Sequence, residues 1–184
     1  MKKHLFAMAA IAIAMGGTMS ASAAQLTDTN TAVSGGTVNF IGQVVDAACS
    51  VSADSINQTV QLSQVRAAKL TTAGMVANQK ENFTIKLEDC DTSVKQNAAV
   101  IFNGQQDANL AGTLANTAGA GSATNVALQL YGPDGQVLNV GDTSSSVVLN
   151  NGENVIPLSV DYIATGEATA GNVSATATFS MVYS

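Results

Sequence analysis

Apolar and polar residues alternate along residues 36–44, shortly before the first cysteine of the chain. Alternation with a period of two predicts a β-strand with one buried face. That face carries Gly36, Val38, Phe40, Gly42 and Val44. Glycine weakens a strand and is tolerated where another backbone approaches closely. Two interpretations follow: the first strand of a sandwich with Gly42 at a bulge, or a strand that lies in a groove of another chain.

The other end of the chain, residues 172–184, shows the same alternation. Ala177, Phe179, Met181 and Tyr183 are separated by Thr178, Ser180 and Val182. This pattern predicts a final strand with one apolar face.

Short alternating stretches separated by turn residues fill the middle of the chain. Asn103 with Gly104 and residues 132–135 predict turns, residues 150–152 predict a hairpin, and Pro157 predicts an edge strand or a bulge. Residues 65–80 lack strand alternation and predict a turn or two of helix. Strands are predicted at residues 58–62, 82–90, 98–102, 125–131, 145–149 and 155–164. Many short strands without a long helix predict an all-β antiparallel sandwich.

Residues 1–23 have the features of a secretory signal peptide. A basic start precedes an apolar run, and Ala21, Ser22 and Ala23 fit the small-x-small cleavage pattern. The apolar run is too short to span a bilayer comfortably. Cleavage after Ala23 leaves 161 residues, and we expect the chain to be exported as one domain.

Cleavage also changes the charge balance. It removes Lys2 and Lys3, two of seven basic residues, while all 13 acidic residues remain, so the mature chain carries a formal charge of −8. A surface of this sign repels phosphate groups, which argues against nucleic acid and anionic membranes as partners.

The two cysteines, Cys49 and Cys90, make one possible pair. Export implies an oxidising compartment, so we expect a disulfide bond between them. The alternative is a metal site, which needs more ligands than two cysteines without histidine supply.

The residues that catalysis commonly uses are scarce. His4, the only histidine, lies in the signal peptide, so the mature chain has no Ser-His or Cys-His pair. The carboxylates of Asp89 and Asp91 flank Cys90, and a polar strand end explains them better than a calcium loop does. We therefore expect neither an enzyme nor a site for a metal or another cofactor.

Several motifs occur in a fixed order along the mature chain. They are residues 35–38 with Phe40 and Gly42, then residues 44–49, 58–62, 64–66, 87–92 and 121–126. A penultimate aromatic residue, Tyr183, and a glycine fourteen residues from the end, Gly171, complete the set. In this order and over the whole mature chain, the motifs resemble those of chaperone–usher pilus subunits, most closely the type 1 fimbrial major pilins.

The resemblance implies an incomplete immunoglobulin-like sandwich that lacks its last strand and carries an N-terminal donor-strand arm. Residues 1–23 would be the signal peptide, residues 24–44 the donor-strand extension and residues 45–184 the sandwich domain. The arm would use Gly36, Val38, Phe40, Gly42 and Val44. The C-terminal strand with Gly171, Ala177, Phe179, Met181 and Tyr183 would border the groove and bind the chaperone.

The function implied is that of a structural subunit that polymerises head to tail by donor-strand exchange in a fimbria supporting cell adhesion. The implied partners are other copies of the chain in a helical polymer, minor pilins, a periplasmic chaperone and an outer-membrane usher. The chain would pass through the periplasm to the cell surface. The alternatives are a minor or adaptor pilin and a secreted carbohydrate-binding sandwich. The lack of tryptophan and the 4% aromatic content argue against the carbohydrate-binding alternative.

Overall fold

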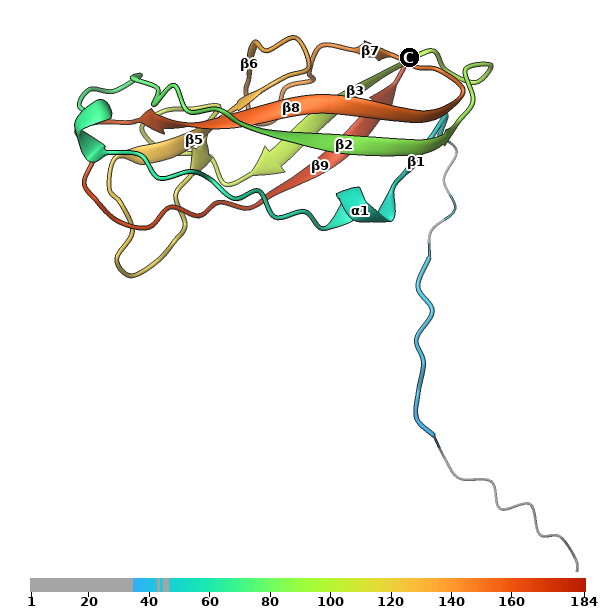
Figure 1. The fold of residues 1–184 in the computed structure, drawn as a ribbon, viewed down its shortest axis with the longest axis horizontal. Coiled ribbons are helices and arrows are strands. Elements are labelled where there is room, and N and C mark those ends of the chain that lie inside the picture. Colours follow the sequence, from blue (N-terminus) through green and yellow to red (C-terminus); the bar gives the residue numbers. More distant parts are fainter. Residues whose placement is uncertain (1–34, 43, 45–46) are drawn as a thin grey trace, which may run out of the picture. The chain divides into compact units, whose positions relative to one another are not determined.

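The computed structural model describes residues 35–42, 44 and 47–184. Residues 44–184 form one compact unit, in which the strands make two antiparallel sheets (Figure 1). The larger sheet contains β1 (Ser50–Val51), β2 (Glu81–Cys90), β4 (Leu114–Ala115), β5 (Val126–Tyr131), β6 (Val137–Leu138) and β8 (Gly152–Ala164). The smaller sheet contains β3 (Asn97–Gly104), β7 (Val147–Val148) and β9 (Ala177–Tyr183). The predicted all-β sandwich is confirmed.

The two sheets have different strand orders. The larger sheet runs β1-β2-β8-β5-β4, and β6 shares the outer edge of β5 with β4. The smaller sheet runs β7-β3-β9, with β3 in the middle. Every strand pair is antiparallel, which gives an immunoglobulin-like sandwich.

Alternate residues of both sheets share one hydrophobic core, as period-two patterning requires. Ile85 on β2, Ile156 on β8 and Val100 on β3 are almost fully buried, and they belong to a single cluster. Leu70, in the connection before β2, is fully buried in the same cluster. A connection between strands therefore contributes to the core together with the strands themselves.

The segment at residues 58–62, predicted to be a strand, has no strand structure. Its neighbour is β2, but the bonds that join them use side chains: the Gln58 amide donates to the Thr84 carbonyl at 2.8 Å, and the Ser63 N–H donates to the Glu81 carboxylate at 3.2 Å. Val60 and Leu62 still pack against the core. The alternation correctly indicated which side chains face the core, but the prediction of a strand was wrong.

The turn predicted at Asn103 and Gly104 is also wrong, because β3 continues through both residues. Gly104 pairs with Ala177 of β9, and a Cβ on it would lie 2.9 Å from the Thr176 carbonyl oxygen. This glycine allows a close approach between backbones and does not form a turn. The turn at residues 132–135 is confirmed, with Gly135 at a φ of 74°.

The hairpin predicted at residues 150–152 is a corner between sheets. The strand before it, β7, pairs with β3, while the strand after it, β8, belongs to the other sheet. Pro157 likewise lies on a central strand, since β8 pairs with both β2 and β5. The β5 pairing stops at Ser159, so β8 has only the β2 partner at Pro157. This local edge accommodates a residue that has no N–H group.

Two short helical turns lie between β1 and β2. The first, α1 (Ala53–Ile56), is not predicted by the sequence pattern, and it is held to β2 because the Ser55 hydroxyl accepts the Lys86 N–H at 2.9 Å. The second is the 3₁₀ turn η1 (Ala67–Lys69), within residues 65–80 where helix is predicted. No helix among the described residues is long and apolar enough to cross a membrane.

The stretch at residues 35–42 belongs to a unit separate from the sandwich. These residues form no strand in this single chain, and the side chains of Val38 and Phe40 are 72% and 92% exposed. The predicted continuation through residues 45–46 and the predicted signal peptide lie outside the described residues.

Candidate functional site

The last strand, β9, has one open edge. Its backbone pairs with β3 from Ala177 to Tyr183, and no backbone bond joins its other edge to any described residue. Free N–H and C=O groups along a strand edge are a template for another strand. The edge of β9 is therefore able to accept one.

The inner face of β9 is apolar and incompletely covered. Phe179, Met181 and Tyr183 are half-buried, whereas their partners on β3, among them Val100 and Phe102, are buried. The Phe179 ring lies 6.2 Å from the Phe102 ring, so its contacts with the core are made on one side. We call this edge and its row of half-buried side chains the open edge.

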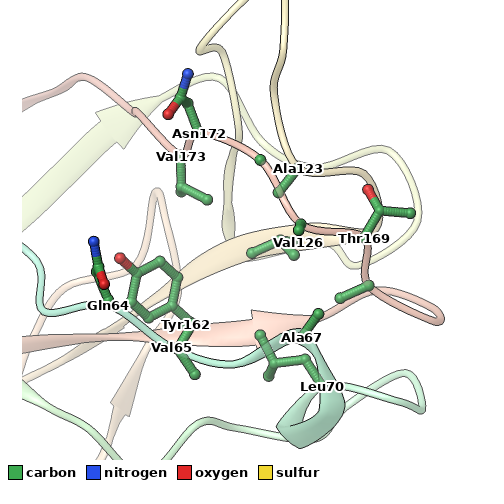
Figure 2. A pocket seen from close by; sticks show the side chains of 13 residues that line it. Gln64, Val65, Ala67, Leu70, Ala123, Val126, Tyr162, Thr169, Asn172 and Val173 are labelled. Atoms are coloured by element: carbon green, nitrogen blue, oxygen red, sulfur yellow. The ribbon is translucent and has the colours of Figure 1, made fainter.

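A cavity of about 340 Å³ lies next to the residues that lead into β9. Residues 168–173 contribute to its lining, together with Gln64, Val65 and Ala67 and with Tyr162 of β8. In Figure 2 the Tyr162 ring lies beside Gln64 and Val65. Most of its lining is apolar, including Val65, Val126 and Val173. The cavity is thus suited to an apolar side chain that enters at the start of β9.

The wall of this cavity depends on Gly171. The neighbouring Asn172 forms a parallel bridge with Ser122, and the two strands of backbone approach so closely that a Cβ on Gly171 would collide with the backbone of Ser122 and Ala123. The Asn116 amide donates to the carbonyls of both Ala123 and Asn172, at 2.9 and 3.0 Å. The lack of a side chain at Gly171 therefore determines the position of this wall of the cavity. Gly171 precedes β9 and is not part of the strand.

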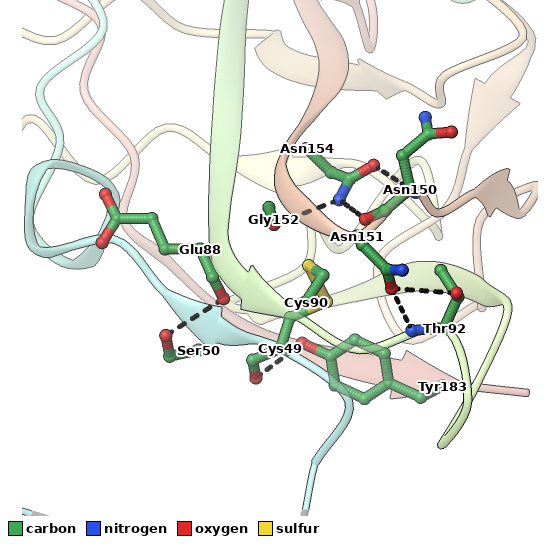
Figure 3. The surroundings of a disulfide bond; sticks show 10 residues. All are labelled: Cys49, Ser50, Glu88, Cys90, Thr92, Asn150, Asn151, Gly152, Asn154 and Tyr183. Atoms are coloured by element: carbon green, nitrogen blue, oxygen red, sulfur yellow. Dashed lines mark hydrogen bonds between the residues drawn. A yellow bond between two sulfur atoms is a disulfide. The ribbon is translucent and has the colours of Figure 1, made fainter.

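The disulfide bond between Cys49 and Cys90 is present, as predicted. It ties the residue before β1 to the last residue of β2 (Figure 3). The Tyr183 hydroxyl donates to the Cys49 carbonyl at 3.3 Å, which joins the end of β9 to the same place. Burial raises the pKa of the Tyr183 hydroxyl and keeps it a neutral donor.

The carboxylates around Cys90 do not gather into a site. Asp91 accepts hydrogen bonds from the hydroxyl and the N–H of Ser93, and these bonds lower its pKa. Within the described residues, no group of three His, Cys, Asp or Glu side chains is placed to hold a metal ion. These carboxylates mark a polar strand end.

The described residues of the predicted arm form no strand in this chain. Gly36, Val38, Phe40 and Gly42 lie in the separate unit, and Val44 begins the unit that contains the sandwich, with its side chain fully exposed. On the strand side, Ala177, Phe179, Met181 and Tyr183 do share the inner face of β9.

Sequence reasoning missed the cavity. Tyr162, Val126 and Val65 come from three distant segments, and each reads as an ordinary core residue. The only local signal was the run of small residues on both sides of Gly171, which is typical of closely packed backbones.

Comparison with known proteins identifies the family. The sequence model of the family described as "Fimbrial protein" matches residues 38–184. The chain is 49% identical over 157 residues to the type-1 fimbrial protein, A chain, of Escherichia coli K12, covering 83% of this chain and 86% of the relative. It is 48% identical over 166 residues to the fimbrial subunit type 1 of Klebsiella pneumoniae, covering 88% and 90%.

A solved structure of a chaperone–usher pilus gives a TM-score of 0.65 at 26% identity, covering 84% of this chain and 98% of that one. These similarities favour a fimbrial subunit over a carbohydrate-binding protein. The chain belongs to the fimbrial protein family, and it is a structural subunit of a bacterial fimbria at the cell surface.

Proposed function

We propose that residues 36–44 are a donor strand that pairs with the open edge of β9 in another copy of the chain. The observation that carries this proposal is the open edge itself, a strand with unpaired backbone groups and a half-buried apolar row. Strand addition at such an edge combines main-chain hydrogen bonds with pockets for alternate side chains.

The arm matches the edge in length and pattern. Nine residues at strand rise span about 30 Å, and the seven residues of β9 span about 23 Å. Val38, Phe40 and Val44 fall on one face of the arm, and burying the three side chains contributes roughly 5–9 kcal/mol before entropy costs. Gly42, between them, lets the arm backbone lie close to the wall of the groove.

An antiparallel pairing of the arm would bring Val44 to the cavity. All other strand pairs in the sandwich are antiparallel, and an antiparallel arm brings its C-terminal end to the start of β9. The cavity lies at that end, beside residues 168–173. We therefore place the Val44 side chain in the cavity, with Phe40 and Val38 farther along β9.

The arrangement produces a filament. Arm and open edge are different surfaces of the same chain, so each copy donates in one direction and accepts in the other. A head-to-tail contact that does not close on itself gives an open helical polymer. Minor pilins with a similar edge or arm would join the same polymer.

An exposed edge with an apolar row is an aggregation hazard before assembly. We propose that a periplasmic chaperone covers it after residues 1–23 are cleaved, and that an outer-membrane usher then exchanges the chaperone for the next arm. The resemblance to chaperone–usher subunits supports this route. A physical reason for it is that no strand of the described chain pairs with the open edge of β9, so a partner is needed to cover that edge.

The test uses a chain that lacks residues 24–43 and a synthetic peptide of residues 35–44. Peptide binding adds main-chain hydrogen bonds along β9 and buries three apolar side chains. Saturating peptide should therefore raise the thermal unfolding midpoint by more than 10 °C, because several kcal/mol of binding free energy correspond to a shift of that order. A peptide with Gly42→Leu should bind weakly, while Ile41→Leu, on the other face, should bind normally. An unchanged midpoint with the unmodified peptide would show that the sandwich is already complete.

A further inference from the structure

Two methionines remain once residues 1–23 are set aside, Met75 and Met181. Met75 lies in the connection before β2, where its side chain is 42% exposed and its sulfur accepts the Thr71 hydroxyl at 3.4 Å. Met181 lies in the middle of β9, on the apolar inner face. A more polar side chain at Met181 would therefore change the apolar face of β9, whereas the same change at Met75 would affect only an exposed connection.

Met181 occupies the centre of the open edge. It pairs with Val100 of β3, which is fully buried, while Met181 itself is half-buried between Phe179 and Tyr183 on the same face. Half-burial on an edge that lacks a neighbouring strand leaves the side chain accessible. An arriving strand would cover this side chain, and the sulfur would then lie in a dry apolar contact.

Peroxide oxidises an accessible thioether to a sulfoxide. The sulfur loses two electrons and gains one peroxide oxygen, the O–O bond breaks, and the second oxygen leaves as water. The product is polar, and methionine sulfoxide reductases restore the thioether. A sulfoxide oxygen buried without a hydrogen-bond donor is costly, and the apolar side chains of the arm offer no donor.

We propose that Met181 is an oxidation site at which peroxide blocks the acceptance of a strand. The proposal rests on the proposed function, because only a strand that arrives at β9 makes the polarity of this position matter. Oxidation acts on the unfilled edge, and an edge that already holds a strand is protected. Met75 is oxidised in either state and has no effect on strand binding.

The experiment uses residues 24–184 as a dilute monomer, hydrogen peroxide as the oxidant and a labelled peptide of residues 35–44. Samples are oxidised before or after the peptide is added in excess, and mass spectrometry of proteolytic fragments locates each added oxygen. The Kd for the peptide is measured by fluorescence anisotropy. Met75→Leu leaves Met181 as the only target, and Met181→Leu is the matched control of similar volume.

In the Met75→Leu chain, oxidation before peptide addition should raise the Kd for the peptide on the order of tenfold or more. Reductase treatment should reverse this rise, and prior filling with peptide should slow oxidation of Met181 by at least a similar factor. The Met181→Leu chain should keep its Kd after the same treatment. Circular dichroism should show that the oxidised chain is still folded.

The outcomes separate the two proposals. If the unoxidised chain fails to bind the peptide, the donor-strand proposal fails and the inference falls with it. If the peptide binds but Met181 oxidises equally with the edge filled or unfilled, or if its sulfoxide leaves the Kd unchanged, only the inference is overturned. Unfolding on oxidation would also overturn it, because the sulfur would then act on the core.

Discussion

At the scale of single residues, Gly171 shows how a position without a side chain can shape a site. The backbone of Ser122 and Ala123 occupies the space where its Cβ would be, and backbone atoms move less readily than the end of a flexible side chain. The walls of the cavity on both sides of this contact come from distant parts of the chain. A single methyl group at Gly171 would therefore change the stability and the cavity together.

Gly171→Ala should lower the free energy of unfolding by roughly 1–3 kcal/mol, the usual cost of forcing extra volume into a packed place. It should also weaken binding of the 35–44 peptide, because the wall on the Asn172 side must shift. Chemical denaturation measures the first effect and a peptide titration the second. Gly35→Ala is the control, since nothing lies within 4 Å of its Cβ position. Equal stability of the two variants would contradict the role given to Gly171.

All three tyrosines have pKa values above the ordinary value of about 10. Burial is the main cause for each, and the negative charge of Asp161 adds to it for Tyr131. The folded chain therefore disfavours the phenolate. Below pH 10 both states hold the proton and stability is complete, whereas above pH 10 the unfolded chain ionises first and stability falls.

We expect the thermal unfolding midpoint to be constant between pH 8 and 9.5 and to fall as the pH rises above about 10. Tyr183→Phe should make this fall shallower, although the loss of the bond to Cys49 lowers the midpoint at neutral pH by the equivalent of about 1 kcal/mol. A midpoint that is insensitive to pH up to 11 would contradict the expected cost of ionisation.

At the scale of elements, β2 holds the sandwich together. It pairs with β1 and β8, and its last residue carries the disulfide to Cys49, 41 residues earlier in the chain. Between Cys49 and the start of β2 the chain has only β1 and two short helical turns, and part of this connection is fixed by side-chain bonds. The disulfide limits the freedom of this segment in the unfolded chain.

The folded chain should therefore show no thiol that reacts with a chromogenic reagent until it is denatured and reduced. The Cys49→Ser, Cys90→Ser double variant should lose about 4 kcal/mol of stability, the entropy estimate for a loop of this size. Denaturant titration of the oxidised and double-variant chains measures the difference. A thiol that titrates in the folded, air-oxidised chain would contradict the bond.

Period-two alternation predicted β2 and β9 well, because burial alternates along each and each is long enough to show the pattern. The strand predicted at residues 125–131 is also present as β5, although all six residues of β5 are buried. It failed where the same residue type is common in two kinds of structure, such as glycine in turns and at close approaches between strands. Gly104 lies inside a strand at a close backbone approach, and residues 150–152 connect two sheets instead of two paired strands. Those choices depend on tertiary neighbours that local pattern does not contain.

The same limit applies to the candidate site. Alternation predicts an apolar face for the arm, which stays a prediction, and it identified the apolar face of β9. The cavity beside Gly171 arises only when segments around residues 65, 126, 162 and 171 meet. The helical turn α1 was missed for the same reason, since its Ser55 hydroxyl is placed by a bond to β2.

At the scale of the whole molecule, the proposed donor strand and the open edge of β9 belong to separable parts of the chain. A chain that lacks residues 24–43 keeps the open edge but has no arm, so we expect it to accept a strand from one neighbour and to donate none to the next. Mixing it with the chain of residues 24–184 should shorten the fibres in proportion to its share of the mixture. Electron microscopy of fibre length measures this, and Met75→Leu in the truncated chain should change nothing.

An unchanged fibre length at equal amounts of the two chains would show that growth does not pass through the arm. A truncated chain that also fails to bind the 35–44 peptide would instead show that the truncation damages the acceptor edge.

The disulfide has a mechanical consequence. A fibre under tension would pull each subunit through its arm, so force would enter the sandwich at Val44, five residues before Cys49. The covalent bond to Cys90 passes that load directly into β2, the strand paired with β1 and β8. The chain between the two cysteines, which are 41 positions apart, does not carry the load, and this keeps about 140 Å of chain per subunit from extending. A reduced fibre should therefore lengthen under loads that an oxidised fibre resists.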